Sequence, residues 1–139
     1  MKHTQTYRNQ HDEIRRAGQQ LAAVMAGGDA IAIRKALAHL CGLVEAHLAL
    51  EDSAFYPALY KHADLEVRRI AKAYQQSMGK LAGVYTEFRM RWMRAGAIEG
   101  DPGGFAKELA DLAGALDKRI DLENTTLYSM VDALEHVAV

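Results

Sequence analysis

The chain has 139 residues, half of them hydrophobic and a quarter charged, which is typical of a soluble globular protein of one domain. A chain of this length buries about two-thirds of the surface that it exposes when unfolded. The formal net charge of -1 excludes the strongly basic surface of a protein that binds nucleic acid or an anionic membrane. Because Cys41 is the single cysteine, a disulfide framework and a cysteine zinc site are excluded as well.

We expect neither a signal peptide nor a membrane-spanning segment. The polar segment from Met1 to Gln10 has no apolar core of a signal peptide. No apolar run approaches the roughly 20 residues that span a bilayer. We therefore expect a cytoplasmic protein without a membrane or nucleic-acid partner.

Helical periodicity and three groups of helix-breaking residues divide the chain into four predicted helices. The breaks lie at residues 27–29, where Asp29 can cap the following helix, at 57–63 and at 100–104. The predicted helices cover residues 9–26, 29–60, 64–97 and 104–136. Because short connections favour antiparallel neighbours, we predict that residues 1–139 form one all-α domain, an up-down-up-down antiparallel four-helix bundle.

Each predicted helix has an inward apolar stripe, and each stripe is interrupted by polar residues. These polar residues are His11, His47, Glu51, Ser77, Arg119 and Glu123. At a rise of about 1.5 Å per residue, counting from the turns places them at one level of the bundle. Beyond that level the predicted stripes continue through Ala54 and Ala58 in the second helix, and through Leu127, Met130 and Leu134 in the fourth.

Two of the interruptions have the same spacing. Glu51 follows His47 by four residues, and Glu123 follows Arg119 by four residues, so each pair lies on one helix face. Ionisable side chains in a bundle core are costly unless they are paired or bound to a cation. The spacing therefore predicts a polar site at the centre of the bundle.

Three segments resemble the hemerythrin family, in its bacterial form the hemerythrin-like (HHE) cation-binding domain. Residues 9–16 are similar to its first-helix motif, a histidine followed by charged residues. Residues 47–57 are similar to the second-helix motif, and residues 119–128 to the fourth-helix motif. The resemblance covers nearly the whole chain. It implies a four-helix bundle around a non-heme di-iron centre that binds, senses or handles dioxygen, nitric oxide or iron.

The sequence departs from this family pattern in two places. Arg119 stands where the fourth helix of the family has a histidine, and a guanidinium cannot ligate a metal. The third helix presents residues 73–78, which include no histidine or acid, and a contribution from Tyr74, Gln76 or Ser77 stays open. The usual ligands that remain could hold one cation, iron first, whereas an intact di-iron centre is not expected. They are His11, His47, Glu51 and Glu123.

Two functions follow from this degenerate di-iron site. In the first, the protein binds one iron or another divalent ion and acts as a sensor or carrier. In the second, it is a metal-free module whose Arg119 bridges Glu51 and Glu123, and whose surface binds a regulatory protein or a second copy. Arg119 could instead extend its head to the surface. Because no nucleophile or open catalytic metal position can be named, we do not expect an enzyme.

Overall fold

The computed structural model describes residues 4–137, which form four long helices and several short helical segments. The long helices are α1 (Gln5–Gly27), α2 (Ala30–Leu50), α4 (Leu65–Trp92) and α6 (Pro102–Leu122). The short segments are η1 (Glu51–Phe55) and α3 (Tyr56–Tyr60) after α2, α5 (Ala97–Gly100) before α6, and η2 (Glu123–Leu127) and α7 (Tyr128–Val137) after α6.

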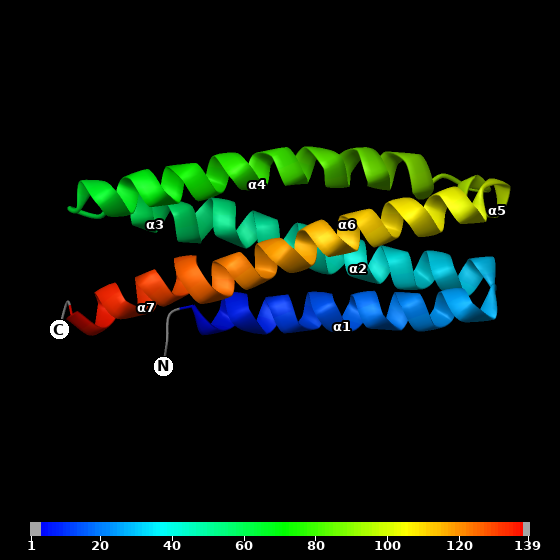
Figure 1. The fold of residues 1–139 in the computed structure, drawn as a ribbon, viewed down its shortest axis with the longest axis horizontal. Helices are drawn as coiled ribbons and strands as arrows, with labels where there is room; N and C mark the ends of the chain where they lie inside the picture. Colours follow the sequence, from blue (N-terminus) through cyan, green and yellow to red (C-terminus); the bar gives the residue numbers. More distant parts are fainter. Residues whose placement is uncertain (1–3, 138–139) are drawn as a thin grey trace.

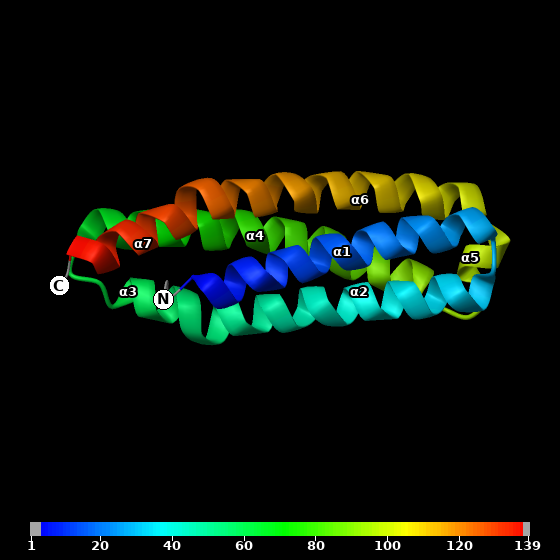
Figure 2. The ribbon, with the colours of Figure 1, turned by 90° about the horizontal axis from the view of Figure 1, so that it is seen from below.

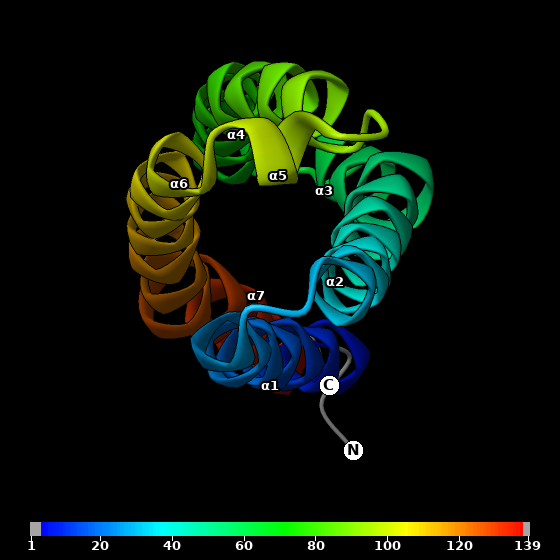
Figure 3. The same cartoon turned by 90° about the vertical axis from the view of Figure 1, so that its right-hand side faces the viewer.

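Consecutive long helices run antiparallel along the length of the molecule (Figure 1 and Figure 2). Seen end-on, the helices form a ring in which α1 lies between α2 and α6, with α4 on the opposite side (Figure 3). This arrangement confirms the predicted all-α, up-down-up-down bundle. None of the helices within residues 4–137 combines the length and apolar character needed to cross a membrane.

The helix boundaries follow from local capping. Gly28 ends α1 in the left-handed region at φ 72°, where its N–H bonds to the carbonyl of Met25. The carboxylate of Asp29 then accepts from the N–H of Ile31 at 3.1 Å, as expected for the cap of α2. Asp101 caps α6 in a similar way by accepting from the N–H of Gly104 at 2.9 Å. The predicted breaks at 27–29 and 100–104 are therefore real turns with identifiable donors and acceptors.

The interior consists of two apolar clusters with a polar layer between them. The larger cluster lies toward the α1–α2 turn and includes Ile14, Val44 and Ile120. The smaller one lies toward the α3–α4 turn and includes Tyr7 and Leu127. The helices and the short segments that continue them pass from one cluster to the other through the polar layer. The side chains of the layer are themselves buried, which strengthens the charge interactions among them.

Two π-helical turns, η1 and η2, interrupt the α-helical hydrogen bonding directly after the two glutamates. In each, the N–H of a tyrosine bonds to the carbonyl five residues earlier, Tyr56 to Glu51 and Tyr128 to Glu123. A π turn holds one residue more than an α turn, and one residue rotates a helix face by about 100°. The inward face is therefore displaced by one position after each glutamate.

This displacement corrects the predicted stripes beyond the polar layer. Ala54 and Ala58 were expected to face inward, but both are exposed. Leu127 is buried as predicted, whereas Met130 and Leu134 are only half-buried. The positions that are buried instead are Phe55, Tyr56 and Leu59 after η1, and Tyr128 and Val131 after η2.

The predicted stripe of the third helix is wrong at its centre. Ser77 and its neighbour Gln76 are exposed, and Met78 is buried in their place. Tyr74 is half-buried. The physical reason is that Ala71 and Met78 lie seven residues apart, two helical turns, and continue the stripe through Tyr85 without Ser77.

Deleting Ser53, an exposed residue inside η1, should convert the π turn into an α turn. Because the deletion removes the extra residue, Phe55, Tyr56 and Leu59 would then follow Glu51 by three, four and seven residues and stay on the inward face. We expect the free energy of unfolding, measured by urea titration, to change by less than about 1 kcal/mol. Inserting an alanine after Ser53 is the contrasting variant: it rotates these side chains by about 100° and should cost more than about 3 kcal/mol. Equal losses in the two variants would show that the π turn is not a one-residue insertion.

Candidate metal centre

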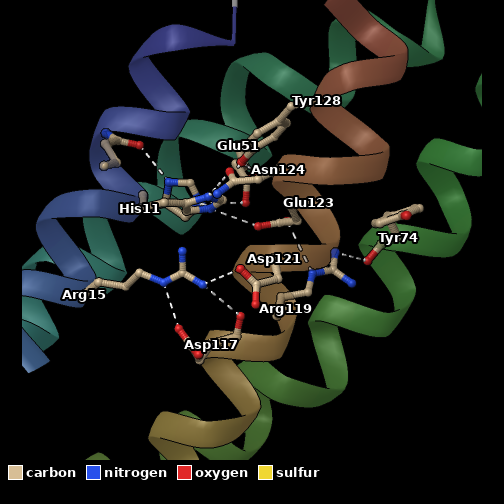
Figure 4. A network of polar contacts seen from close by, with 12 residues as sticks. His11, Arg15, Glu51, Tyr74, Asp117, Arg119, Asp121, Glu123, Asn124 and Tyr128 are labelled. Carbon is tan, nitrogen blue, oxygen red and sulfur yellow. Dashed lines mark hydrogen bonds and ion pairs between the residues drawn. The ribbon is translucent and has the colours of Figure 1, made fainter.

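Five ionisable side chains meet in the polar layer, and all five are buried. Glu51 and His11 are 1% exposed, Glu123 2%, His47 4% and Arg119 7%. They come from three parts of the chain: His11 lies on α1, His47 on α2 with Glu51 at the start of η1, and Arg119 on α6 with Glu123 at the start of η2. Figure 4 shows how His11, Glu51, Arg119 and Glu123 lie in this layer. The structure thus brings together all four residues that the sequence analysis singled out as candidate ligands, and Arg119 with them.

The two imidazoles face each other through the same ring nitrogen. The Nε2 atoms of His11 and His47 lie 3.0 Å apart. The Oε1 atom of Glu123 is 3.0 Å from Nε2 of His11, and the Oε1 atom of Glu51 is 3.2 Å from Nε2 of His47. Potential ligand atoms of His11, His47 and Glu123 all lie within 4.8 Å of one another. Two nitrogens and one oxygen of Glu123 therefore converge on one small volume, and Glu51 borders it through His47.

Side-chain amides determine the tautomer of both rings. The Nδ1 atom of His11 lies 2.8 Å from Oδ1 of Asn124, and Nδ1 of His47 lies 2.7 Å from Oε1 of Gln10. An amide oxygen can only accept, so each Nδ1 carries a proton and donates it. Both Nε2 atoms then direct their lone pairs at the shared volume. A histidine that ligates a metal is usually oriented by such an outer hydrogen bond.

Lone pairs that face each other at these distances repel unless a positive charge lies between them. Glu51 and Glu123 add two negative charges to the same place, and Arg119 balances only one of them. The Oε1 atom of Glu51 has no hydrogen-bond donor among the described residues, although it is buried. The arrangement therefore favours an additional positive charge in this volume, either a proton on one of these contacts or a metal ion.

Each glutamate turns its second oxygen away from the histidines. The hydroxyl of Tyr128 donates to Oε2 of Glu51 at 2.7 Å. Burial, together with the charges of Glu123 and Glu51, raises the pKa of Tyr128, so its phenol stays protonated and remains a donor. Burial acts to raise the pKa of Glu51, but a positive charge on the His47–His11 pair, together with the hydrogen bond from Tyr128, outweighs this and lowers the pKa below its usual value.

Arg119 does not extend to the surface, and it pairs with one glutamate rather than two. Its Nε lies 3.3 Å from Oε2 of Glu123, and one terminal nitrogen donates to the carbonyl of Tyr74 at 2.7 Å. The guanidinium also lies 5.0 Å from the centre of the Tyr74 ring. Within residues 4–137 no ion pair joins Arg119 to Glu51, so the expected bridge between both acids is wrong. Glu51 is too far away because it faces His47 and Tyr128.

The third long helix contributes to this layer through Tyr74 alone. Its carbonyl and ring hold Arg119, while Ser77 and Gln76 point to solvent and take no part. The sequence left open whether Tyr74, Gln76 or Ser77 contributes to the site. Of these three residues, Tyr74 contacts the layer and the other two do not.

Four residues of the site were missed by the sequence analysis. Gln10 orients the ring of His47, and Asn124 orients the ring of His11. Tyr128 donates to Glu51, and Tyr56 accepts from Arg119 at 3.3 Å. One signal was available for the tyrosines, since each follows a layer glutamate by five residues. Five residues is the repeat of a π turn, not of an α turn, and an α-helical stripe cannot reveal it.

Comparison with known proteins agrees with this architecture. The family profile described as the hemerythrin HHE cation binding domain matches residues 3–131. The chain therefore belongs to the hemerythrin family. No curated protein and no solved structure matches it.

Removing the Tyr128 hydroxyl should leave a buried carboxylate oxygen without its donor. We expect Tyr128→Phe to lower the free energy of unfolding by about 1–3 kcal/mol in chelator-treated protein. Tyr56→Phe is the control, because its hydroxyl accepts only a long bond from Arg119, whose same nitrogen also bonds to the Tyr74 carbonyl. Its loss should stay below about 1 kcal/mol. Urea unfolding of both variants measures the difference, and equal losses would refute the role given to Tyr128.

Proposed function

We propose that the protein binds one divalent transition-metal ion, iron first, through His11, His47, Glu51 and Glu123. The observation that carries this proposal is the pair of Nε2 atoms 3.0 Å apart, each with its Nδ1 proton committed to an amide oxygen. Imidazole nitrogens with carboxylate oxygens suit iron, zinc and similar ions. A tetrahedron with metal–ligand bonds of about 2.0 Å has edges of about 3.3 Å, and three contacts of this set have similar lengths of 3.0–3.2 Å: Nε2 to Nε2, and each Nε2 to the Oε1 atom of its neighbouring glutamate. His11, His47 and Glu123 form the compact part of the site, with ligand atoms within 4.8 Å of one another, and Glu51 joins it through its contact with His47.

Contacts on the far side of each glutamate favour one ion over two. When a carboxylate bridges two metals through both of its oxygens, each oxygen binds one metal, so an oxygen already engaged by another group is less available. Here Oε2 of Glu51 accepts from Tyr128, and Oε2 of Glu123 faces Arg119. The guanidinium also places a fixed positive charge beside Glu123, which disfavours a second cation there. These contacts support a mononuclear site rather than a di-iron centre.

A binding role, as a sensor or carrier of iron, dioxygen or nitric oxide, is proposed in preference to catalysis. Bound Fe(II) would supply a centre able to bind such diatomic molecules. The residues of this chain hold the ion, orient the rings and exclude water. No nucleophile or general acid with access to a substrate is among the residues of the layer, and this supports a protein that is not an enzyme.

The second candidate is a metal-free module that acts through its surface on a regulatory protein or on a second copy. It is favoured by the buried contact of Arg119 with Glu123, which already neutralises one of the two acids. In this case a proton on the histidine pair completes the charge balance. The two candidates differ in whether a metal ion displaces that proton.

Metal titration of chelator-treated protein distinguishes them. We expect one Fe(II) or Zn(II) per chain by elemental analysis, and a rise in melting temperature. At a free metal concentration of about 100 times Kd, the added stability is about 2.7 kcal/mol. His47→Ala should abolish both effects. His39→Ala is the matched control, since His39 is an exposed histidine of the same helix. An unaltered melting temperature for the parent protein would favour the metal-free module.

Arg119→His should restore the ligand that the family has at this position. It removes the charge beside Oε2 of Glu123 and frees that oxygen. We expect iron uptake to increase from one ion toward two ions per chain, with new oxo-bridge absorption bands in air. Arg15→His, which alters an arginine outside the layer, should bind no additional iron. Unchanged stoichiometry in Arg119→His would mean that Arg119 is not what limits the site to one ion.

A further inference from the structure

A second feature of the interior is a large apolar cavity in the half of the bundle toward the α1–α2 turn. Its volume is about 770 Å³, and side chains from α1, α2, α4 and α6 line it. Several of its lining residues on α1 and α6 are small and exposed, which marks an opening between these two helices. They include Ala22, Ala110, Ala113 and Gly114, with the half-buried Gly18 beside them.

The polar groups of the lining are already paired or neutral. At the rim, Arg15 bonds to Asp117 at 2.7 Å and to Asp121 at 2.6 Å. Inside, the hydroxyl of Tyr85 donates to the carbonyl of Cys41. Burial raises the pKa of both Tyr85 and Cys41, so neither carries a charge. The inner wall therefore offers no charge to a polar ligand.

Size and chemistry together limit what can fill this space. Water needs two to four polar partners to be stable in a cavity, and the inner wall provides few. An empty cavity deprives its lining of packing contacts. A diatomic molecule would fill only a small part of the volume, which lies within the range of about 300–1,000 Å³ that is usual for organic ligands. Replacing poorly bonded water by an apolar molecule is favourable.

We propose that this cavity is a binding site for an uncharged, apolar organic molecule that enters between α1 and α6. Its inner end is formed by Ile14, Val44 and Ile120. Each of them is three residues from a member of the polar layer, namely His11, His47 and Glu123 respectively. The ligand would lie about one helical turn from the proposed metal centre but contact none of its four ligands. This site does not depend on the metal.

The cavity can be closed without removing any side chain. Gly18 and Gly114 line its mouth from opposite helices, and a Cβ added at either position meets no atom within 4 Å. Gly18→Leu and Gly114→Leu should therefore fill the opening. Gly42→Leu is the matched control, because Gly42 is an exposed glycine inside α2 with equally free surroundings, away from the cavity. All three replacements gain similar helix propensity.

The experiment is a fluorescence titration of the full chain with the uncharged dye N-phenylnaphthylamine, with and without added Zn(II). We expect saturable binding of one dye per chain in the parent protein and in Gly42→Leu. The dissociation constant should increase by about ten-fold or more in Gly18→Leu and in Gly114→Leu. Circular dichroism and cooperative urea unfolding identify the variants that are folded.

Three outcomes would overturn the proposal. The first is an absence of saturable dye binding to the folded parent protein. The second is equal affinity of a folded mouth variant and the control. The third is a stable dimer by sedimentation that excludes the dye, which would mean that a second copy covers the opening. Because the titration is read with and without Zn(II), failure of metal binding would leave the result on the cavity unaffected.

Discussion

The structure depends on the mutual approach of two imidazole nitrogens inside a layer that excludes water. The Nε2 atoms of His11 and His47 lie 3.0 Å apart, each beside a carboxylate oxygen. Two carboxylates and one guanidinium leave one uncompensated negative charge, which is costly at this depth. An additional positive charge beside the rings would stabilise the layer. The two candidate functions differ in whether a proton or a metal ion provides this charge.

The two π turns make this layer possible. An uninterrupted α-helix would carry the stripe from Glu51 to Ala54 or Ala58, leaving Tyr56 off the inward face. The extra residue rotates the chain after each glutamate, so that Tyr56 and Tyr128 are buried next to the acids. The hydroxyl of Tyr128, at the start of α7, then donates to Glu51, at the start of η1, at 2.7 Å. The π turns thus place residues that link the segment after α2 to the segment after α6.

Most of the fold and part of the site could be predicted from the sequence. Asp29 and the glycines around 100–104 indicated the turns because capping is local. α-Helical periodicity places four residues in one layer, because α1 has no π turn and the relevant parts of the other helices lie before their π turns. These residues are His11, His47, Glu51 and Glu123. Ala54 and Ala58 were misassigned because the extra residue of a π turn leaves no mark in hydrophobic periodicity. Gln10 and Asn124 were missed because amides that bond across helices have no fixed spacing along the chain.

The spacing between α1 and α6 connects the polar layer with the apolar cavity. That spacing sets the contact of His11 with Glu123, which is 3.0 Å, and also the width of the opening between Gly18 and Gly114. At the polar layer, side chains fill the space between α1 and α6, whereas at the level of the cavity small residues leave space between the two helices unfilled. A molecule held in the cavity would act on the same pair of helices that position two of the candidate ligands. By linkage, any effect of cavity occupancy on metal affinity must be matched by an equal effect of the metal on occupancy.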